Sequence, residues 1–247
     1  CLPTAVTKAF NIAKAPLTVE IEDRESVYGE EIKTLADLIT AGTVYKDDQP
    51  YIVKTDVVKG SAVGDYKIYG EITNANYDVT FIKGNYKITK REITVTISNA
   101  SSTYGSAISP LSASITAGET YQSEVAFKVS TTATSASNVG TYPITGEITN
   151  TNYDITFIDG VYTINKAPIT FTASNLSIIY GDKAPEYTYT PTAPEGVTVT
   201  LSSDYVQSKD GGAVGSYTIS LSATDTTGNY DITTVNGTLT VGKATLT

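Results

Sequence analysis

The sequence predicts an all-β protein made of three tandem immunoglobulin-like β-sandwich modules in an elongated array. Three observations lead to this fold class. Short motifs recur about every 76 residues, apolar and polar residues alternate along many short segments, and Gly, Asn or Asp separates these segments. A fixed period is typical of a tandem array, and a module of this size is large enough to fold by itself.

Three motifs mark the period: Tyr-Gly, Val-Gly-x-Tyr and Asn-Tyr-Asp. They supply the structural repeat markers, which are Tyr28, Gly29, Gly64, Tyr66, Tyr77 and Asp78, then Tyr104, Gly105, Gly140, Tyr142, Tyr153 and Asp154, then Tyr180, Gly181, Gly215, Tyr217, Tyr230 and Asp231. From this register we expect repeats at residues 14–89, 90–165 and 166–247.

Residues 1–13 are expected to be the closing strand of a preceding repeat or a linker. Phe10 and Ile12 match Tyr162 and Ile164 two periods later. We therefore expect the chain to be a piece of a longer array.

Each repeat is expected to open with a strand, as the alternation of Leu17, Val19 and Ile21 indicates. The Tyr-Gly pair that follows suits a strand-ending turn, because glycine tolerates positive φ. The Val-Gly-x-Tyr motif then begins another strand. Its tyrosine resembles the corner tyrosine of immunoglobulin-like domains, and its glycine is expected to satisfy backbone geometry.

The segment after Tyr-Gly favours two different structures. In the first repeat, Ile32, Leu35 and Ile39 have helical spacing, which would fit a β-grasp module instead. One period later, Leu111 and Ile115 lie in a segment that alternates every second residue, and the third repeat alternates as well. Two repeats of three favour a strand, so a strand is the prediction and a short helix in the first repeat the alternative.

A closing hairpin is predicted at the end of every repeat. Alternating residues flank Lys83-Gly84, Asp159-Gly160 and Asn236-Gly237, and such pairs favour two-residue turns with positive φ. A two-residue loop would set these apolar residues opposite one another: Phe81 and Tyr86, Val79 and Ile88, Phe157 and Tyr162, Ile155 and Ile164, and Ile232 and Val241. About four residues, Thr89 to Glu92, would then join the first repeat to the second.

Composition excludes several classes of function. The chain has 247 residues, no histidine, and one cysteine, Cys1, so histidine-based nucleophilic catalysis and thiolate metal clusters are excluded. The net charge of −9 disfavours binding to nucleic acids and anionic lipid surfaces. The sequence has no run of about 18 apolar residues, so no membrane insertion is expected in this segment.

The order of these motifs resembles the MBG domain of the YGX type. The matching residues are Tyr180-Gly181-Asp182, Pro185 with Tyr187-Thr188-Tyr189, the Val-Gly-x-Tyr and Asn-Tyr-Asp motifs, and a closing Lys-Ala. The resemblance covers almost the whole chain, and the first repeat departs most from it. It implies a bacterial adhesin-type protein, extracellular at the cell surface or wall, in which such repeats build a stalk. It implies no binding residue.

A structural role is the simpler interpretation of the recurring residues. The tyrosines of Tyr-Gly are expected to plug the end of a sandwich, half-buried, with the hydroxyl bonded to a loop. Asp78, Asp154 and Asp231 could bind calcium, but capping of backbone amides is the commoner role, and no dense calcium loop is present. No catalytic, cofactor or metal residue is therefore assigned, and no enzyme is expected.

The predicted function is a stalk or spacer that projects a distal domain, with neighbouring repeats of the same chain as its partners. The alternative is an adhesion module that binds a host glycan, mucin or protein through the segments between Tyr-Gly and Val-Gly. Those segments keep their length but change their chemistry between repeats, whereas a repeated binding site would keep its polar residues. The hypothesis of a hydrolase with paired carboxylates has still less support, because no such pair follows from the tandem pattern.

Overall fold

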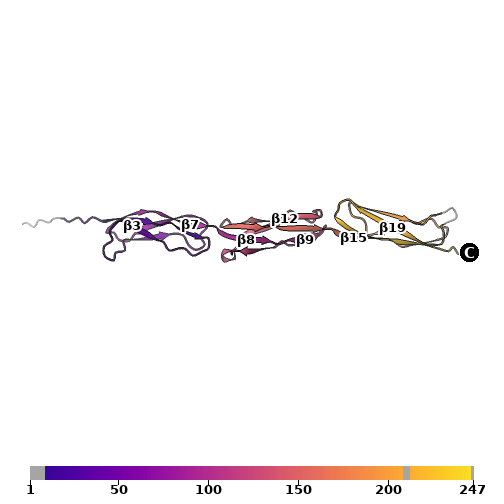
Figure 1. Cartoon of the computed structure of the whole chain (residues 1–247), viewed down its shortest axis with the longest axis horizontal. Helices are drawn as coiled ribbons and strands as arrows, with labels where there is room; N and C mark the ends of the chain where they lie inside the picture. The colour runs from indigo at the N-terminus through magenta and orange to yellow at the C-terminus, as the bar shows by residue number, and fades with distance from the viewer. Residues whose placement is uncertain (1–8, 208–211, 246–247) are drawn as a thin grey trace, which may run out of the picture. The chain divides into compact units, whose positions relative to one another are not determined.

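The computed structural model describes residues 9–207 and 212–245, and all its regular structure apart from one 3-10 turn is β-strand (Figure 1). No α-helix occurs in these ranges, which confirms the all-β class and removes the β-grasp alternative. The chain divides into two compact units. One contains residues 1–96, 114–128 and 146–158, and the other contains 97–113, 129–145 and 159–247.

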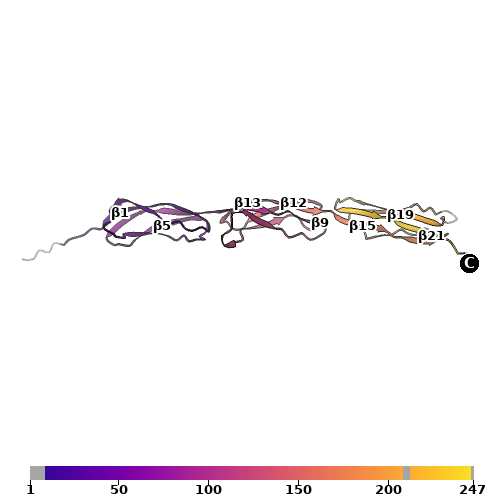
Figure 2. The same cartoon turned by 60° about the horizontal axis from the view of Figure 1, so that its bottom comes forward.

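The first repeat lies within the first unit and is a two-layer sandwich. Its strands are β1 (Ala15–Ile21), β2 (Arg24–Val27), β3 (Asp37–Gly42), β4 (Tyr51–Thr55), β5 (Gly64–Ile72), β6 (Tyr77–Ile82) and β7 (Gly84–Thr89). They form two sheets, ordered β3-β1-β6 and β2-β7-β5-β4. Figure 2 shows β1 and β5, which belong to different sheets. Val19, Ile68 and Tyr86 are fully buried in the core, so each sheet buries one face of its alternating strands.

The same order of strands recurs in the rest of the chain. The second repeat has β8 (Arg91–Ile97), β9 (Ala100–Thr103), β10 (Ala113–Ala117), the turn η1 (Tyr121–Ser123), β11 (Phe127–Thr131), β12 (Gly140–Ile148), β13 (Tyr153–Ile158) and β14 (Gly160–Asn165). The third has β15 (Ala167–Ala173), β16 (Leu176–Ile179), β17 (Tyr189–Thr190), β18 (Val197–Ser203), β19 (Gly215–Asp225), β20 (Tyr230–Val235) and β21 (Gly237–Gly242). Their sheets are ordered β10-β8-β13, β11-β12-β14-β9, β17-β15-β20 and β16-β21-β19-β18.

The predicted closing hairpin is wrong in all three repeats, although both of its strands exist. In the first repeat β6 pairs in parallel with β1, so that Phe81 faces Val19, and β7 pairs antiparallel with β5, so that Tyr86 faces Tyr66. The two strands therefore lie in different sheets. The residues of the other predicted pairs also lie in different sheets. Their observed register partners are Leu17 for Val79, Gly64 for Ile88, Ile93 for Ile155, Val95 for Phe157, Tyr142 for Tyr162, Gly140 for Ile164, Ile169 for Ile232 and Gly215 for Val241.

The glycine that begins the second of these strands marks a crossing between the two sheets and not a turn. Gly84, Gly160 and Gly237 do not have positive φ. A Cβ on Gly84 would lie 2.6 Å from the carbonyl oxygen of Ile21, and the same approach, at 2.6 to 2.8 Å, recurs in the other two repeats. Glycine is needed because the chain passes against the backbone at the end of the first strand as it moves from one sheet to the other.

The segment after Tyr-Gly forms the strand that two repeats favoured. β3, β10 and β17 each pair with the opening strand of their repeat, and the helical spacing of Ile32, Leu35 and Ile39 does not produce a helix. Pairing with β1 overrides that local pattern.

Residues 1–8 of the segment 1–13, expected to be a closing strand or a linker, lie outside the described residues. Residues 9–14 have no regular secondary structure, and Phe10 and Ile12 are 91% and 94% exposed. Their counterparts Tyr162 and Ile164 are buried because β14 lies between β12 and β9. Residues 9–13 form no strand with the described residues, and their assignment to the closing strand of a preceding repeat or to a linker stays a prediction.

Candidate functional site

The recurring residues gather where one repeat follows another. β7 ends at Thr89 and β8 begins at Arg91, so a single exposed residue, Lys90, joins the first two repeats. Lys166 alone joins β14 to β15. The predicted connection of about four residues is therefore too long. Each junction lies within one compact unit, and so short a link keeps the ends of successive repeats in contact.

Tyr28 crosses the first junction. Its side chain is only 4% exposed, and its hydroxyl donates a hydrogen bond to Oε1 of Glu124, in the second repeat, at 2.8 Å. Its ring lies edge-on to those of Tyr121 and Tyr153, with centroids 5.6 Å apart in both cases. Tyr28 therefore packs into the start of the next repeat and is buried, where the sequence predicts a half-buried tyrosine that plugs the end of a sandwich with its hydroxyl bonded to a loop.

The Tyr-Gly turn holds this side chain in place. The amide of Tyr28 donates to the carbonyl of Thr89 at 2.9 Å, and Gly29 has a φ of 78°, which glycine adopts without strain. Arg91 donates from Nε to the carbonyl of Tyr28 at 2.8 Å. The turn is repeated at Tyr104-Gly105 and Tyr180-Gly181, where the glycine φ angles are 77° and 94°.

Glu124 is the centre of the polar contacts at this junction. Its Oε2 accepts from the hydroxyl of Tyr153 at 2.9 Å and from the side-chain amide of Asn150 at 3.2 Å, while Oε1 accepts from Tyr28. The hydroxyl of Tyr153 also accepts from the amide of Tyr121 at 2.8 Å. Burial, followed by the hydrogen bond to Glu124, raises the pKa of Tyr28, and burial raises the pKa of Tyr153 to about 12.

The other two motifs meet at the junctions as well. The amide of Val63, before Gly64, donates to the side-chain oxygen of Asn152 in the second repeat at 2.9 Å. At the second junction the amide of Val139 donates to Asn229 at the same distance, and the ring of Tyr104 lies edge-on to Tyr230 at 5.5 Å. Asparagine from Asn-Tyr-Asp thus holds the Val-Gly turn of the repeat before it.

The tyrosines of Val-Gly-x-Tyr form hydrogen bonds to the backbone of their own repeat. Tyr66, Tyr142 and Tyr217 each donate to a carbonyl four residues earlier at 2.8 Å, which is the anchoring role of a corner tyrosine. Gly64 and Gly215 do not have positive φ, and a Cβ on Gly64 would meet only the ring of Tyr66, at 3.9 Å. Backbone geometry therefore does not explain these two glycines.

The recurring aspartates do not cap backbone amides. Asp78, Asp154 and Asp231 are exposed, within strands β6, β13 and β20, and their carboxylates form no hydrogen bond among the described residues. Neighbouring residues cap instead. The side chains of Asn74 and Asn150 each accept a hydrogen bond from the backbone amide two residues later. The carboxylate of Asp225 accepts from the hydroxyl of Thr227 and from the backbone amides of Thr227 and Tyr230. These hydrogen bonds, above all the one from the Thr227 hydroxyl, lower the pKa of Asp225 to about 2.

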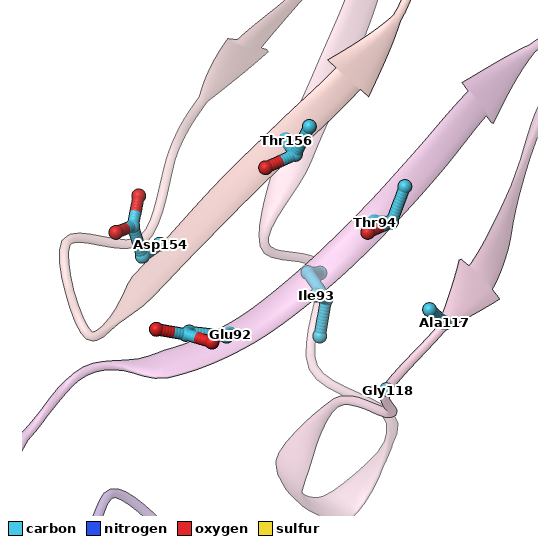
Figure 3. A pocket seen from close by; sticks show the side chains of 7 residues that line it. All are labelled: Glu92, Ile93, Thr94, Ala117, Gly118, Asp154 and Thr156. Carbon is cyan, nitrogen blue, oxygen red and sulfur yellow. The ribbon is translucent and has the colours of Figure 1, made fainter.

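Glu92 and Asp154 form a carboxylate pair that the tandem pattern did not predict. They are register partners on the parallel strands β8 and β13 and line a shallow hollow of about 440 Å³ (Figure 3). The corresponding partners of Asp78 and Asp231 are Pro16 and Pro168, so the pair belongs to the second repeat only. Within the described ranges no three His, Cys, Asp or Glu residues are grouped as a metal ion would need.

Sequence reasoning missed two recurring sets that the same period contains. Asp23, Asn99 and Asn175 each accept a hydrogen bond from the amide that follows the crossing glycine, at 2.7 to 2.8 Å. Tyr121 and Glu124 at the junction have counterparts Tyr45 and Asp48, 76 residues earlier. Their spacing could have revealed them, but only contacts across the junction give them a role.

The sequence profile of the MBG domain (YGX type) matches residues 17–87, 93–163 and 169–240. No curated protein matches the chain. Among solved structures, the chain is similar to Drosophila N-cadherin EC1-3, with 10% identity and a TM-score of 0.28 over 90% of this chain and 98% of that one. For Drosophila N-cadherin EC1-4 the identity is 9% and the TM-score 0.21, over 90% and 74%. No helix among the described residues is long and apolar enough to cross a membrane.

Proposed function

Because the chain belongs to the MBG domain (YGX type) family, we propose that it is a non-enzymatic stalk segment of a bacterial surface protein, located outside the cell at the surface or wall. In this role the repeats are spacers that hold a distal domain away from the cell. Their boundaries are proposed at 14–89, 90–165 and 166–247, so that the linking residues Lys90 and Lys166 open the second and third repeats.

The contact of Tyr28 with Glu124 carries this proposal. A spacer must resist bending, and bending at the first junction would separate the Tyr28 hydroxyl from a carboxylate 2.8 Å away and expose a buried ring. The second junction supports the same role through Val139 and Asn229. The recurring residues thus serve contacts between repeats, as a spacer requires, and the acidic surface discourages association of neighbouring stalks.

Small-angle X-ray scattering tests the stalk. We expect a rod-like profile with a largest dimension of roughly 100 Å, from about 3.3 Å per strand residue. Replacing Tyr28 and Glu124 with alanine should give a more flexible, more compact ensemble without changing the circular dichroism spectrum. Tyr69→Phe, which removes a hydroxyl bonded to Asp56 away from the junction, is the matched control and should leave the profile unchanged. A compact wild-type profile would contradict the proposal.

An adhesion role predicts a different result in a second assay. The test is whether the wild-type chain binds saturably to glycan or mucin arrays and loses that binding when residues between Tyr-Gly and Val-Gly are substituted. That result would identify the chain as a binding module and contradict a role as a spacer alone. The stalk proposal expects no saturable binding on such arrays.

A further inference from the structure

The Tyr-Gly and Val-Gly turns lie on opposite sides of the link between two repeats. In the sheet β11-β12-β14-β9, strands β12 and β9 flank β14, which leads through Lys166 into β15. Tyr104-Gly105 follows β9 and Val139 precedes β12, and strands β5, β7 and β2 have the same order at the first junction. Each junction therefore has a Tyr-Gly side and a Val-Gly side, and resistance to bending requires contacts on both.

The Tyr-Gly side is held less firmly at the second junction than at the first. Tyr28 is 4% exposed, lies edge-on to two rings and donates a hydrogen bond to Glu124. Tyr104 is only partly buried and lies edge-on to the ring of Tyr230. Neither hydroxyl of this second pair forms a hydrogen bond among the described residues, so the contact between the two rings is what holds this side closed.

The loop that receives the tyrosine accounts for this difference. Gly196 corresponds to Ala126, because the carbonyl of each accepts a hydrogen bond from the turn that precedes Asn-Tyr-Asp. Two residues before them, Pro194 therefore takes the place of Glu124. A proline side chain has no oxygen, so the acceptor that binds the Tyr28 hydroxyl has no counterpart at this position.

The arginine that holds the Tyr-Gly turn is also replaced. Arg91 donates from Nε to the carbonyl of Tyr28 at 2.8 Å, and its counterpart in the third repeat is Ala167. The backbone at the two positions is the same, because the Arg91 amide donates to the carbonyl of Asn152 at 3.0 Å and the Ala167 amide donates to that of Asn229 at 2.9 Å. The second junction therefore has the backbone for this contact but not the side chain.

The Val-Gly side, in contrast, is fully held at the second junction. The side-chain oxygen of Asn229 accepts from the amide of Val139 at 2.9 Å, as its counterpart does at the first junction. The side-chain amide of Asn229 also donates to the side-chain oxygen of Asn138 at 3.0 Å. The residue that corresponds to Asn138 in the first repeat is Ala62, so this second hydrogen bond belongs to the second junction alone. Asn229 is 2% exposed, which shields both bonds from water.

We propose that the second junction is a one-sided hinge, whose Tyr-Gly side opens while Asn229 remains bonded to Val139 as the pivot. Opening separates the rings of Tyr104 and Tyr230 but breaks no side-chain hydrogen bond among the described residues. At the first junction the same movement breaks the hydrogen bond to Glu124 and exposes a buried ring. Opening therefore occurs at the second junction, where fewer buried contacts resist it. The hinge does not depend on whether the repeats act as spacers or as an adhesion module.

Distances between pairs of spin labels, measured by double electron–electron resonance on the full chain, test the hinge. The native cysteine is first removed by Cys1→Ser, so that only introduced cysteines carry a label. The pairs span the Tyr-Gly side of the first junction, the same side of the second, and the Val-Gly side of the second. All labelled positions are exposed, and the pairs are, in that order, Glu25→Cys with Thr156→Cys, Ser101→Cys with Thr233→Cys, and Thr145→Cys with Thr233→Cys.

We expect the Tyr-Gly pair of the second junction to have a broader distance distribution than that of the first, with a tail at longer distances. The Val-Gly pair of the second junction should stay narrow, because the pivot keeps that side closed. Equal distributions for the two Tyr-Gly pairs would overturn the proposal. A Val-Gly pair as broad as the Tyr-Gly pair of the same junction would overturn it as well, since the junction would then have no pivot.

Exchanging the side chains of one matched position tests the cause of the difference. Arg91→Ala should broaden the distribution of the Tyr-Gly pair at the first junction, because the turn loses the hydrogen bond to its carbonyl. Ala167→Arg should narrow that of the second, because it supplies a donor for the carbonyl of Tyr104. Thr200→Arg adds the same charge at an exposed position of β18 and is the control, which should leave the second distribution unchanged. Failure of both exchanges to alter their pairs would contradict the hinge as argued from this contact.

Discussion

At the scale of the residue, the tyrosine of Tyr-Gly acts in the repeat that follows its own. Tyr28 is anchored by its backbone to Thr89 but places its ring and hydroxyl among Tyr121, Tyr153 and Glu124. An aromatic ring with a polar end suits this position, because the ring is buried while the hydroxyl reaches a carboxylate. The recurrence of Tyr-Gly thus reflects a contact between repeats.

A double-mutant cycle should measure this contact. Tyr28→Phe and Glu124→Gln should each lower the free energy of unfolding in urea, and their coupling energy should be about 1 kcal/mol, typical of one hydrogen bond. Tyr66→Phe with Glu124→Gln is the control pair and should show no coupling, because Tyr66 bonds only to its own backbone. Equal coupling in both pairs would show that Tyr28 and Glu124 do not interact.

The pKa of Tyr153 predicts loss of stability in alkali. Burial raises this pKa from 10.0 to about 12, so between these values the unfolded chain has lost the phenolic proton while the folded chain retains it. The stabilisation is complete below pH 10 and is lost as the pH rises towards 12. A titration followed by tyrosinate absorbance should show tyrosines that ionise well above pH 10, and Tyr153→Phe should remove one of them. Tyr51, whose pKa is also raised to about 12, should remain.

The sequence located these residues but could not assign their contacts. A period of 76 residues finds Tyr28, Asn152 and Val63 by their counterparts, whatever they touch. It cannot say whether a residue packs in its own repeat or the next, because both contacts recur with the same period. Asp78 shows the converse: it recurs, yet it is exposed and its carboxylate forms no hydrogen bond within the described parts of the chain.

At the scale of the element, alternation predicted strands and the faces they bury, but not their neighbours. Val79 lies on the buried face of β6, as the period of two indicates. Its neighbour is Leu17 of β1, far away in the sequence, and not Ile88 across the glycine. A half-buried strand has the same pattern in a hairpin and in a sandwich, so the crossing at Gly84 could be recognised only from the backbone around it.

Two glycines of the first repeat should respond differently to alanine. Gly84→Ala places a Cβ 2.6 Å from the carbonyl oxygen of Ile21 and should destabilise the protein by about 1–3 kcal/mol through displacement of backbone. Gly64→Ala places one 3.9 Å from the Tyr66 ring, without positive φ, and should be neutral or slightly stabilising. Thermal and urea unfolding would measure both changes. Equal losses in the two variants would contradict the crossing as the reason for Gly84.

At the scale of the whole molecule, the period predicted the three repeats, and the family profile confirms three matches. The sequence did not predict how closely the repeats are joined. A single residue, Lys90 or Lys166, separates the last strand of one repeat from the first strand of the next, so the end of each of the first two repeats packs against the repeat that follows. Stability should therefore include a term for each junction in addition to the terms for the repeats.

The strand pairing of the first repeat predicts its response to pulling. β2 and the closing strand β7 are parallel, with Arg24 beside Tyr86 and Val27 beside Thr89, and β1 is parallel to β6. A load that enters through Lys14 and leaves through Lys90 draws these strands past each other, so their hydrogen bonds break together. Attachment through Lys14 and Ala75, at the same end of β1 and β6, would break them one after another. Single-molecule force spectroscopy should find a higher unfolding force for the first attachment, and equal forces would contradict this expectation.

The parallel pairing also has a consequence for a protein tethered at one end and pulled at the other by flowing liquid. Under such tension the hydrogen bonds between β2 and β7 are loaded in shear and share the force. Each repeat then remains closed until many bonds fail at once, and afterwards releases its chain in a single step. A tether of such repeats would absorb a sudden pull by lengthening one repeat at a time while the others stay folded.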